Sequence, residues 1–386
     1  MNPKRLSLNA VKSLLMHPPQ SPAVTIYLPT HRRASPPKIS ADEVRLKNLK
    51  NEAVKIIRTF DEGKKFADGF NSQLDQLIES LPFWEHQDKG LLICARPNLF
   101  QLFYLPLDTK EYLAVDKMFH LAPVLGLLGD LQNRYYVLAI SQHEPALFGG
   151  DYYSLRRLDV GLPQSLRQAL QIDEPDRISE QQHSARGHNG YNGRGGDKDI
   201  AQDERLRFWR LIDRKCLKYT ERDRPLLLVG IASEVAEYLE QTRYPSVIKN
   251  HIEGSWSNPN LSELFLQAIA MIKQEVVASR HTSIVNEFKK LRGSMPELTA
   301  NNLIDIMTAA EQGRVDKLLL AGIRVTADTV REDRRPAEVI NFPPQETAEI
   351  VNRVALKVWS SRGKIVLLKT NQMPVKGAGI LAVLRY

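Results

Sequence analysis

The sequence predicts an α/β protein built from three domains. Its 386 residues exceed the roughly 250–300 at which one hydrophobic core stops growing. Short apolar runs typical of strands alternate along most of the chain with amphipathic stretches typical of helices. With 42% hydrophobic and 25% charged residues, the composition excludes a largely disordered or membrane-embedded chain. We place the domains at residues 1–130, 131–272 and 273–386.

The first domain is expected to open with a helix that ends before Pro18. Because polar residues interrupt its apolar positions, we interpret it as an amphipathic helix and not as a signal peptide. A β-rich run, AVTIYLP, predicts a strand, and two apolar runs around Pro97-Asn98 predict a hairpin. Apolar residues at helical spacing predict two helices between them. In order, the expected elements are a strand at 23–29, helices at 41–60 and 66–81, and hairpin strands at 90–96 and 99–105.

In the second domain the pattern indicates several strands in succession, followed by helices that alternate with strands. This order predicts a mixed sheet with helices packed on it. We expect strands at 135–140, 146–148, 154–160, 225–231 and 247–252, and helices at 203–219 and 234–241. A long helix over 261–291 leads into the third domain. There we expect helices at 302–312 and 347–360, stopped by Gly313 and Gly363, and strands at 315–321, 364–369 and 379–385.

The net charge of +8 is concentrated at one end of the chain. Residues 1–60 contain eleven Lys or Arg and three Asp or Glu, an excess that equals the net charge of the whole chain. Positive and negative residues are therefore equal in number in the rest of the sequence. A confined positive field attracts polyanions, so the charge by itself indicates nucleic acid or an anionic membrane surface, although a solubilising surface accounts for the same charge. No apolar window reaches the about 18 residues of a membrane helix, so no membrane partner is expected. Only two cysteines, Cys94 and Cys216, occur far apart, which favours a reducing, cytoplasmic location.

Conventional enzyme motifs are absent from the sequence: it has no phosphate-binding Gly-Lys-Ser/Thr loop, no nucleophile elbow and no His-Glu-x-x-His. We expect no cofactor and no metal, because loop histidines such as His183 and His188 lack rigid support. His31 is read as a structural histidine or as a partner of phosphate or an acidic residue. Cys216 lies in an apolar helix pattern and is read as a core residue.

A glycine-rich segment at 183–204 is the most distinctive feature of the chain. At its tip, Arg194-Gly195-Gly196 presents backbone N–H groups without shielding Cβ atoms, so it can approach a phosphate or an oxyanion closely. The helix that follows places Arg207, Arg210 and Arg214 on one face. A loop joined to a basic helix fits a contact with nucleic acid, and a plain insertion before a surface helix is the alternative.

Taken in order, several segments resemble the bacterial branch of the archaeo-eukaryotic peptide-chain release factor family. They are TIYLPTHR at 25–32, RLKNL at 45–49, the Gly195-Gly196 loop leading into RFWR at 207–210, AAEQGRVDKLLL at 309–320, and the ending from Met373-Pro374 to AVLRY. The resemblance spans nearly the whole chain. It implies an α/β N-terminal domain, a ribonuclease-H-like middle domain that carries the loop, and an α/β C-terminal domain similar to a ribosomal protein.

The resemblance further implies a tRNA-shaped protein whose partners are the ribosome, through its rRNA, and the tRNA acceptor end, with the third domain offering a surface for a protein partner. The expected RNA-binding residues are Arg32, Arg33, Arg45, Lys47, Lys50, Arg194, Arg207, Arg210 and Arg214. In true release factors a Gly-Gly-Gln tip assists hydrolysis of peptidyl-tRNA. Here Asp197 follows Gly195-Gly196, and no Asn-Ile-Lys-Ser stop-codon element occurs.

These departures favour a codon-independent ribosome factor, acting in rescue, quality control or hibernation. Two alternatives stay open. One is a metal-independent peptidyl-tRNA hydrolase in which the backbone amides of Gly195, Gly196 and Asp197 polarise the ester or the attacking water; the charge of Asp197 disfavours it. The other is a protein-interaction scaffold that reuses the fold.

Overall fold

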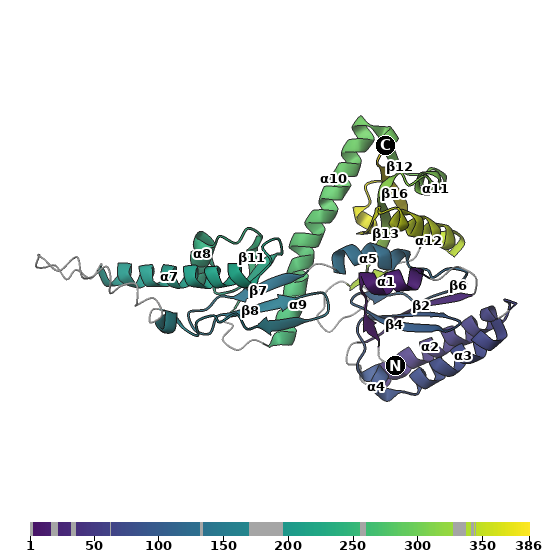
Figure 1. Cartoon of the computed structure of the whole chain (residues 1–386), viewed down its shortest axis with the longest axis horizontal. Helices are drawn as coiled ribbons and strands as arrows, with labels where there is room; N and C mark the ends of the chain where they lie inside the picture. The colour runs from purple at the N-terminus through teal and green to yellow at the C-terminus, as the bar shows by residue number, and fades with distance from the viewer. Residues whose placement is uncertain are drawn as a thin grey trace, which may run out of the picture. The chain divides into compact units, whose positions relative to one another are not determined.

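The computed structural model (Figure 1) describes residues 3–16, 22–31, 36–61, 63–131, 134–169, 196–254, 260–326, 337–340, 343 and 345–386. It consists of two compact units, which we call unit 1 (residues 1–132 and 281–386) and unit 2 (residues 133–280). Helices and strands mix in both units, which confirms the predicted α/β class. The ends of the chain share one unit; the three domain boundaries stay a prediction.

Unit 1 contains a five-stranded sheet from its N-terminal part, in the order β1-β4-β3-β2-β6. The strands are β1 (Lys4–Arg5), β2 (Ala23–Pro29), β3 (Gly90–Arg96), β4 (Leu99–Leu105) and β6 (Tyr112–Asp116). The predicted hairpin is confirmed: β3 and β4 pair antiparallel, and Asn98 takes φ 65° in the turn. Apolar residues from α2 (Pro36–Ile57), α3 (Gly63–Ile78) and α4 (Leu81–Glu85) join strand residues in one core.

The N-terminal helix α1 (Leu8–Leu15) is where the sequence predicts it. Ser7 caps it, accepting a hydrogen bond from the Ala10 backbone N–H at 3.2 Å. Val11 and Leu14 are buried, whereas Lys12 on the other side is exposed. The helix is therefore anchored by one apolar stripe and presents its lysine to solvent.

A second sheet in unit 1 combines strands from both ends of the chain. Its order is β12-β16-β13-β14-β5, with β15 paired to β13. The strands are β5 (Asp108–Thr109), β12 (Thr299–Ala300), β13 (Val315–Thr326), β14 (Ala337–Ile340), β15 (Lys364–Lys369) and β16 (Ile380–Leu384). Since β5 pairs with β14, residues 1–132 and 281–386 share a hydrogen-bonded sheet.

Helices also join the two ends of the chain in unit 1. A Cβ added at Gly126 of α5 (Ala122–Leu131) would lie 2.9 Å from the Leu367 Cβ, so only glycine allows this close approach to β15. Asn352 of α12 (Gln345–Ser360) is 2% exposed; its Oδ1 accepts from the Leu121 and Ala122 N–H groups at 2.8 and 3.2 Å. Its amide donates to the Phe119 carbonyl at 3.0 Å.

The end of α11 (Leu303–Glu311) confirms a predicted helix stop. Asn302 caps its start, accepting from the Ile304 N–H at 3.0 Å. Gly313 takes φ +70°, the left-handed conformation that ends a helix and favours glycine. The short helices η2 (Pro296–Leu298) and η3 (Thr370–Gln372) complete this part of unit 1.

Unit 2 is built on a five-stranded sheet in the order β11-β10-β7-β8-β9. The strands are β7 (Tyr135–Ala139), β8 (Ala146–Gly150), β9 (Leu155–Leu158), β10 (Leu226–Gly230) and β11 (Val247–Glu253). The strands β7, β10 and β11 are parallel, whereas β8 and β9 each pair antiparallel with a neighbour. This sheet is mixed, as the sequence predicts.

Helices cover both faces of the unit 2 sheet (Figure 1). One face packs against α7 (Gly196–Tyr219) and α8 (Ala232–Gln241), and the other against α9 (Leu261–Ile272). The helix continues through π-helical η1 (Lys273–Val277) into α10 (Ala278–Ser294), close to the long helix predicted over 261–291. Among helices in the described ranges, none is long and apolar enough to cross a bilayer.

Candidate nucleic-acid interface

Helix α7 begins at Gly196, earlier than the start near Asp203 that the sequence pattern predicts. Its first nine residues contain four acids, Asp197, Asp199, Asp203 and Glu204. These residues show no apolar periodicity, which explains why the sequence pattern predicts a later start. Gly196 and Asp197 of the predicted tip therefore lie in the first turn of α7, while Arg194 and Gly195 are outside the described residues.

The buried face of α7 fixes which residues face solvent. Phe208, Trp209, Ile212 and Cys216 are buried against the sheet. The indole Nε1 of Trp209 donates to Glu237 of α8 at 3.0 Å. With this face held in the core, the opposite side of α7 presents its cations to water.

Two carboxylates hold α7 against α8. Burial tends to raise the pKa of Glu237, but hydrogen bonds from Trp209 and Arg205 outweigh it and hold the pKa below its usual value. The buried Asp213 of α7 accepts from the Thr242 hydroxyl at 2.6 Å and from the Tyr238 hydroxyl at 3.1 Å. These contacts fix the orientation of α7 against α8.

The three arginines predicted on one face of α7 differ in their partners. Arg207 forms an ion pair with Asp203 at 2.9 Å, which offsets its charge. Arg210 donates to the neutral Gln241 at 2.9 Å and stays exposed. Arg214 is exposed and has no acidic partner in the described parts of the chain. Arg210 and Arg214 are therefore the cations of this face that keep an uncompensated charge.

The edge strand β9 adds two cations that the sequence analysis did not single out. Arg156 and Arg157 are both exposed. The end of β9 adjoins α7: Leu158 packs on the core that contains Trp209, and the Lys215 ammonium lies 3.8 Å from where a Cβ at Gly161 would be. The adjacent arginines within an apolar run, LRRL, were the available signal. Because side chains alternate along a strand, Arg156 lies with Leu158 on the sheet face that α7 covers, and Arg157 lies with Leu155 on the face that α9 covers.

In unit 1 the structure divides the predicted N-terminal cations into neutralised and exposed ones. Arg45 pairs with Asp42 at 3.2 Å and with Glu111 at 3.3 Å. Lys50 is buried and pairs with Asp75. Lys47 is exposed without an acidic partner among the described residues, and Arg32 and Arg33 lie outside them.

His31 contacts an acidic residue, which is one of the two roles considered from the sequence. Its Nδ1 lies 2.9 Å from Asp42 Oδ2. Burial is the main influence on the pKa of Asp42 and raises it, while the contacts with His31 and Arg45 act in the opposite direction. Asp42 therefore contacts both His31 and Arg45, and it offsets the charge of Arg45.

The ends of the parallel strands in unit 2 form a polar pocket outside the predicted site. It holds about 260 Å³ and is lined by Ser141, Gln142, His143 and Glu234, among others. Burial raises the pKa of Glu234, and the hydrogen bond from the Gln142 amide at 2.9 Å partly opposes this. Such crevices at the carboxyl ends of strands are frequent ligand sites in α/β folds.

The residues that the structure describes contain no group of three His, Cys, Asp or Glu able to hold a metal. Both cysteines are buried. Burial raises the pKa of Cys216 to about 12, and it also raises the pKa of Cys94. Neither thiol is a nucleophile at neutral pH, because the thiolate is the reactive form.

Residues 134–314 match the sequence model of Bacterial archaeo-eukaryotic release factor family 3. This match confirms the family resemblance over the residues that it covers. No curated protein matches the chain.

Several solved structures are similar at low identity. Archaeoglobus fulgidus Pelota is 14% identical, with 77% of this chain and 79% of that chain covered and a TM-score of 0.36. The archaeal translation termination factor aRF1 is 13% identical, with 99% of each chain covered and a TM-score of 0.24. S. cerevisiae Dom34 is 12% identical, with 67% of this chain and 65% of that chain covered and a TM-score of 0.34. At these scores the structural likenesses carry no argument about function.

Proposed function

Because this chain is related to the bacterial archaeo-eukaryotic release factors over residues 134–314, we propose that it is a translation factor that binds the ribosome without reading a codon. Its role would lie in rescue, quality control or hibernation. The family match is the observation that carries this proposal. The absence of an Asn-Ile-Lys-Ser element from the sequence supports the codon-independent part.

The exposed cations of unit 2 are proposed to contact RNA phosphates. Arg156 and Arg157 on β9, and Arg210 and Arg214 on α7, are exposed. Arg156 lies on the sheet face that α7 covers and Arg157 on the face that α9 covers, because side chains alternate along a strand. Contacts with phosphates release counterions, so affinity falls as salt rises. In unit 1, Lys47 is the predicted RNA-binding lysine that remains available for the same role.

Sedimentation with ribosomes tests this function. We expect the protein to pellet with ribosomes at ~0.1 M salt and to be released at ~0.5 M salt. The double variant Arg156→Glu, Arg157→Glu should lower the affinity and reduce the slope of log affinity against log salt by about 2. The matched control, Lys289→Glu with Lys290→Glu on exposed positions of α10, should bind as the wild type does.

Each outcome has a defined meaning. Failure to pellet at either salt concentration contradicts ribosome binding and favours a non-ribosomal scaffold. Equal losses in the β9 variant and the α10 control contradict a localised interface, because they indicate attraction by net charge alone.

Hydrolysis of peptidyl-tRNA is not expected from the tip. The first nine residues of α7 contain four acids and one lysine, Lys198, and this negative charge opposes the approach of a phosphate-rich acceptor end. Release of a labelled peptide from stalled ribosomes measures the activity directly. Release by the wild type that is lost in Gly195→Ala with Gly196→Ala would establish the hydrolase alternative.

A further inference from the structure

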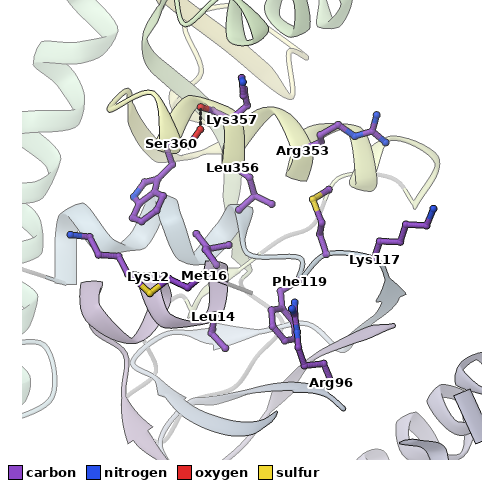
Figure 2. A pocket seen from close by; sticks show the side chains of 13 residues that line it. Lys12, Leu14, Met16, Arg96, Lys117, Phe119, Arg353, Leu356, Lys357 and Ser360 are labelled. Atoms are coloured by element: carbon purple, nitrogen blue, oxygen red, sulfur yellow. Dashed lines mark hydrogen bonds between the residues drawn. The ribbon is translucent and has the colours of Figure 1, made fainter. Parts of the chain in front are cut away.

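A concave site of about 580 Å³ lies within unit 1, between α1, residues 117–119 and α12 (Figure 2). Three segments that are distant in the sequence therefore form its walls. This volume is within the range of small-molecule sites, roughly 300–1,000 Å³. None of its lining residues belongs to the predicted RNA-binding set.

The interior of this site is apolar. Leu14 and Phe119 are buried at its base, and Leu15, Leu356 and Trp359 are half-buried around them. Two aromatic rings and branched aliphatic side chains offer a ligand flat and apolar contact surfaces. A bound ligand therefore requires an apolar body.

The surroundings of the site are strongly positive. Five of its thirteen lining residues are Lys or Arg, and none is Asp or Glu. Figure 2 shows Lys12 on one side of the site and Lys117 and Arg353 on the other. The described chain gives Lys12, Lys117 and Lys357 no acidic partner. A cleft lined by one sign of charge over apolar walls concentrates counter-ions, here anions.

Nearby carboxylates are already engaged. Glu349 pairs with Arg353 at 2.8 Å. Asp116 accepts from the backbone N–H of Lys117 at 2.6 Å and contacts His120 at 3.1 Å. They reduce the positive field but do not line the site.

A buried arginine adds to the positive charge at the base. Arg96 is 7% exposed and its guanidinium lies 4.4 Å from the centre of the Phe119 ring. Burial lowers the pKa of Arg96, so its surroundings disfavour the cation. An anion in the site would oppose this effect.

Uncharged polar groups are scarce in the lining, which narrows the ligand class. Ser360 is the single uncharged polar residue among those lining the site, and its hydroxyl donates to the Lys357 carbonyl at 2.8 Å. The lysine and arginine side chains of the lining only donate hydrogen bonds, so the N–H donors of a nucleobase would stay without acceptors, which is unfavourable when buried. We propose that this site binds small organic anions that join an apolar, preferably aromatic, body to a carboxylate, sulfonate or phosphate group.

Two dyes with the same aromatic body test the proposal on the full chain. Anilinonaphthalene sulfonate carries the acidic group, and phenylnaphthylamine lacks it. We expect the sulfonate to bind one saturable site per chain with a dissociation constant on the order of 10–100 µM. We expect the neutral dye to bind about tenfold more weakly or not at all.

Variants locate the dye. Lys12→Glu with Lys117→Glu changes two exposed residues and should weaken sulfonate binding at least about tenfold. Trp359→Phe should reduce emission sensitised through tryptophan while a saturable site persists. The control Lys289→Glu with Lys290→Glu makes the same charge change elsewhere in unit 1 and should bind the dye normally. Circular dichroism identical to the wild type verifies the fold of each variant.

Three results would overturn the proposal: no saturable binding of the sulfonate, equal affinity for the neutral dye, or unchanged binding by the folded Lys12→Glu, Lys117→Glu variant. The proposal is independent of ribosome binding, because the dye assay contains no ribosomes.

Discussion

Lys47 and Lys50 lie three residues apart on α2, and both were expected to bind RNA, yet their surroundings differ. Lys47 is exposed, whereas the Lys50 side chain is 7% exposed and pairs with Asp75, whose side chain is 43% exposed. This difference in burial between the two partners predicts an asymmetry. Asp75→Asn should destabilise unit 1 more than Lys50→Met does.

The magnitudes follow from which charge is left behind. Asp75→Asn leaves the buried ammonium of Lys50 without its carboxylate, and removing one partner of a buried pair costs about 3–5 kcal/mol. Because Asp75 is half-exposed, we expect the lower end, about 3 kcal/mol. Lys50→Met keeps an apolar stem and leaves Asp75 hydrated and bonded to Asn71 Nδ2 at 2.8 Å, so about 1 kcal/mol is expected.

Native-state hydrogen exchange of the β3 amides measures both losses in the same unit. About 3 kcal/mol corresponds to roughly a 150-fold rise in the opening equilibrium, and about 1 kcal/mol to roughly fivefold. Lys47→Met should change stability by less than about 0.5 kcal/mol and should reduce the salt slope of ribosome binding by about 1. Lys50→Met should leave that slope unchanged. Equal destabilisation by Asp75→Asn and Lys50→Met would refute the reasoning from burial.

Three further predictions concern packing and charge. Glu237→Gln should destabilise unit 2 by about 1.5 kcal/mol near neutral pH. The folded-state pKa of Glu237 lies below its usual value of 4.5, so its carboxylate stabilises unit 2 above pH 4.5 and this stabilisation is lost as the pH falls through the folded-state pKa. Urea unfolding at several pH values measures this dependence. Asn352→Ala removes three buried hydrogen bonds and should cost about 2–4 kcal/mol, seen as faster exchange of the α5 amides. Gly126→Ala should lower the free energy of unfolding by about 1–2 kcal/mol, because the added Cβ would press on β15, and thermal melting measures this loss. The control Gly129→Ala, whose Cβ meets nothing within 4 Å, should be neutral or stabilising.

Much of the secondary structure follows from local sequence chemistry. The strands predicted at 23–29, 90–96, 99–105 and 364–369 coincide with β2, β3, β4 and β15. Their boundaries are set by proline, glycine and asparagine, whose backbone preferences act within one or two residues. The start of α7 was predicted too late, since its first turns carry acidic residues in place of an apolar pattern.

The candidate interface was predictable only in part. The sequence identifies the cations, but not which of them meet an acid. Arg45 contacts Glu111, which immediately precedes β6, and Lys50 contacts Asp75 of α3. Both acids are distant in the sequence from α2 and are brought beside it by folding. Arg156 and Arg157 gain significance only because β9 is an edge strand in the sheet order.

By itself, the sequence determined the α/β class, the succession of most elements, the family resemblance and the concentration of positive charge in residues 1–60. The tertiary structure alone decided which cations remain exposed, that both ends of the chain share unit 1, and that a cationic, apolar-lined cavity lies between α1 and α12. The difference arises from the distance along the chain over which each kind of interaction acts. Hydrophobic periodicity and turn chemistry act between near neighbours in the chain, whereas ion pairing, burial and concavity depend on side chains that only folding brings together.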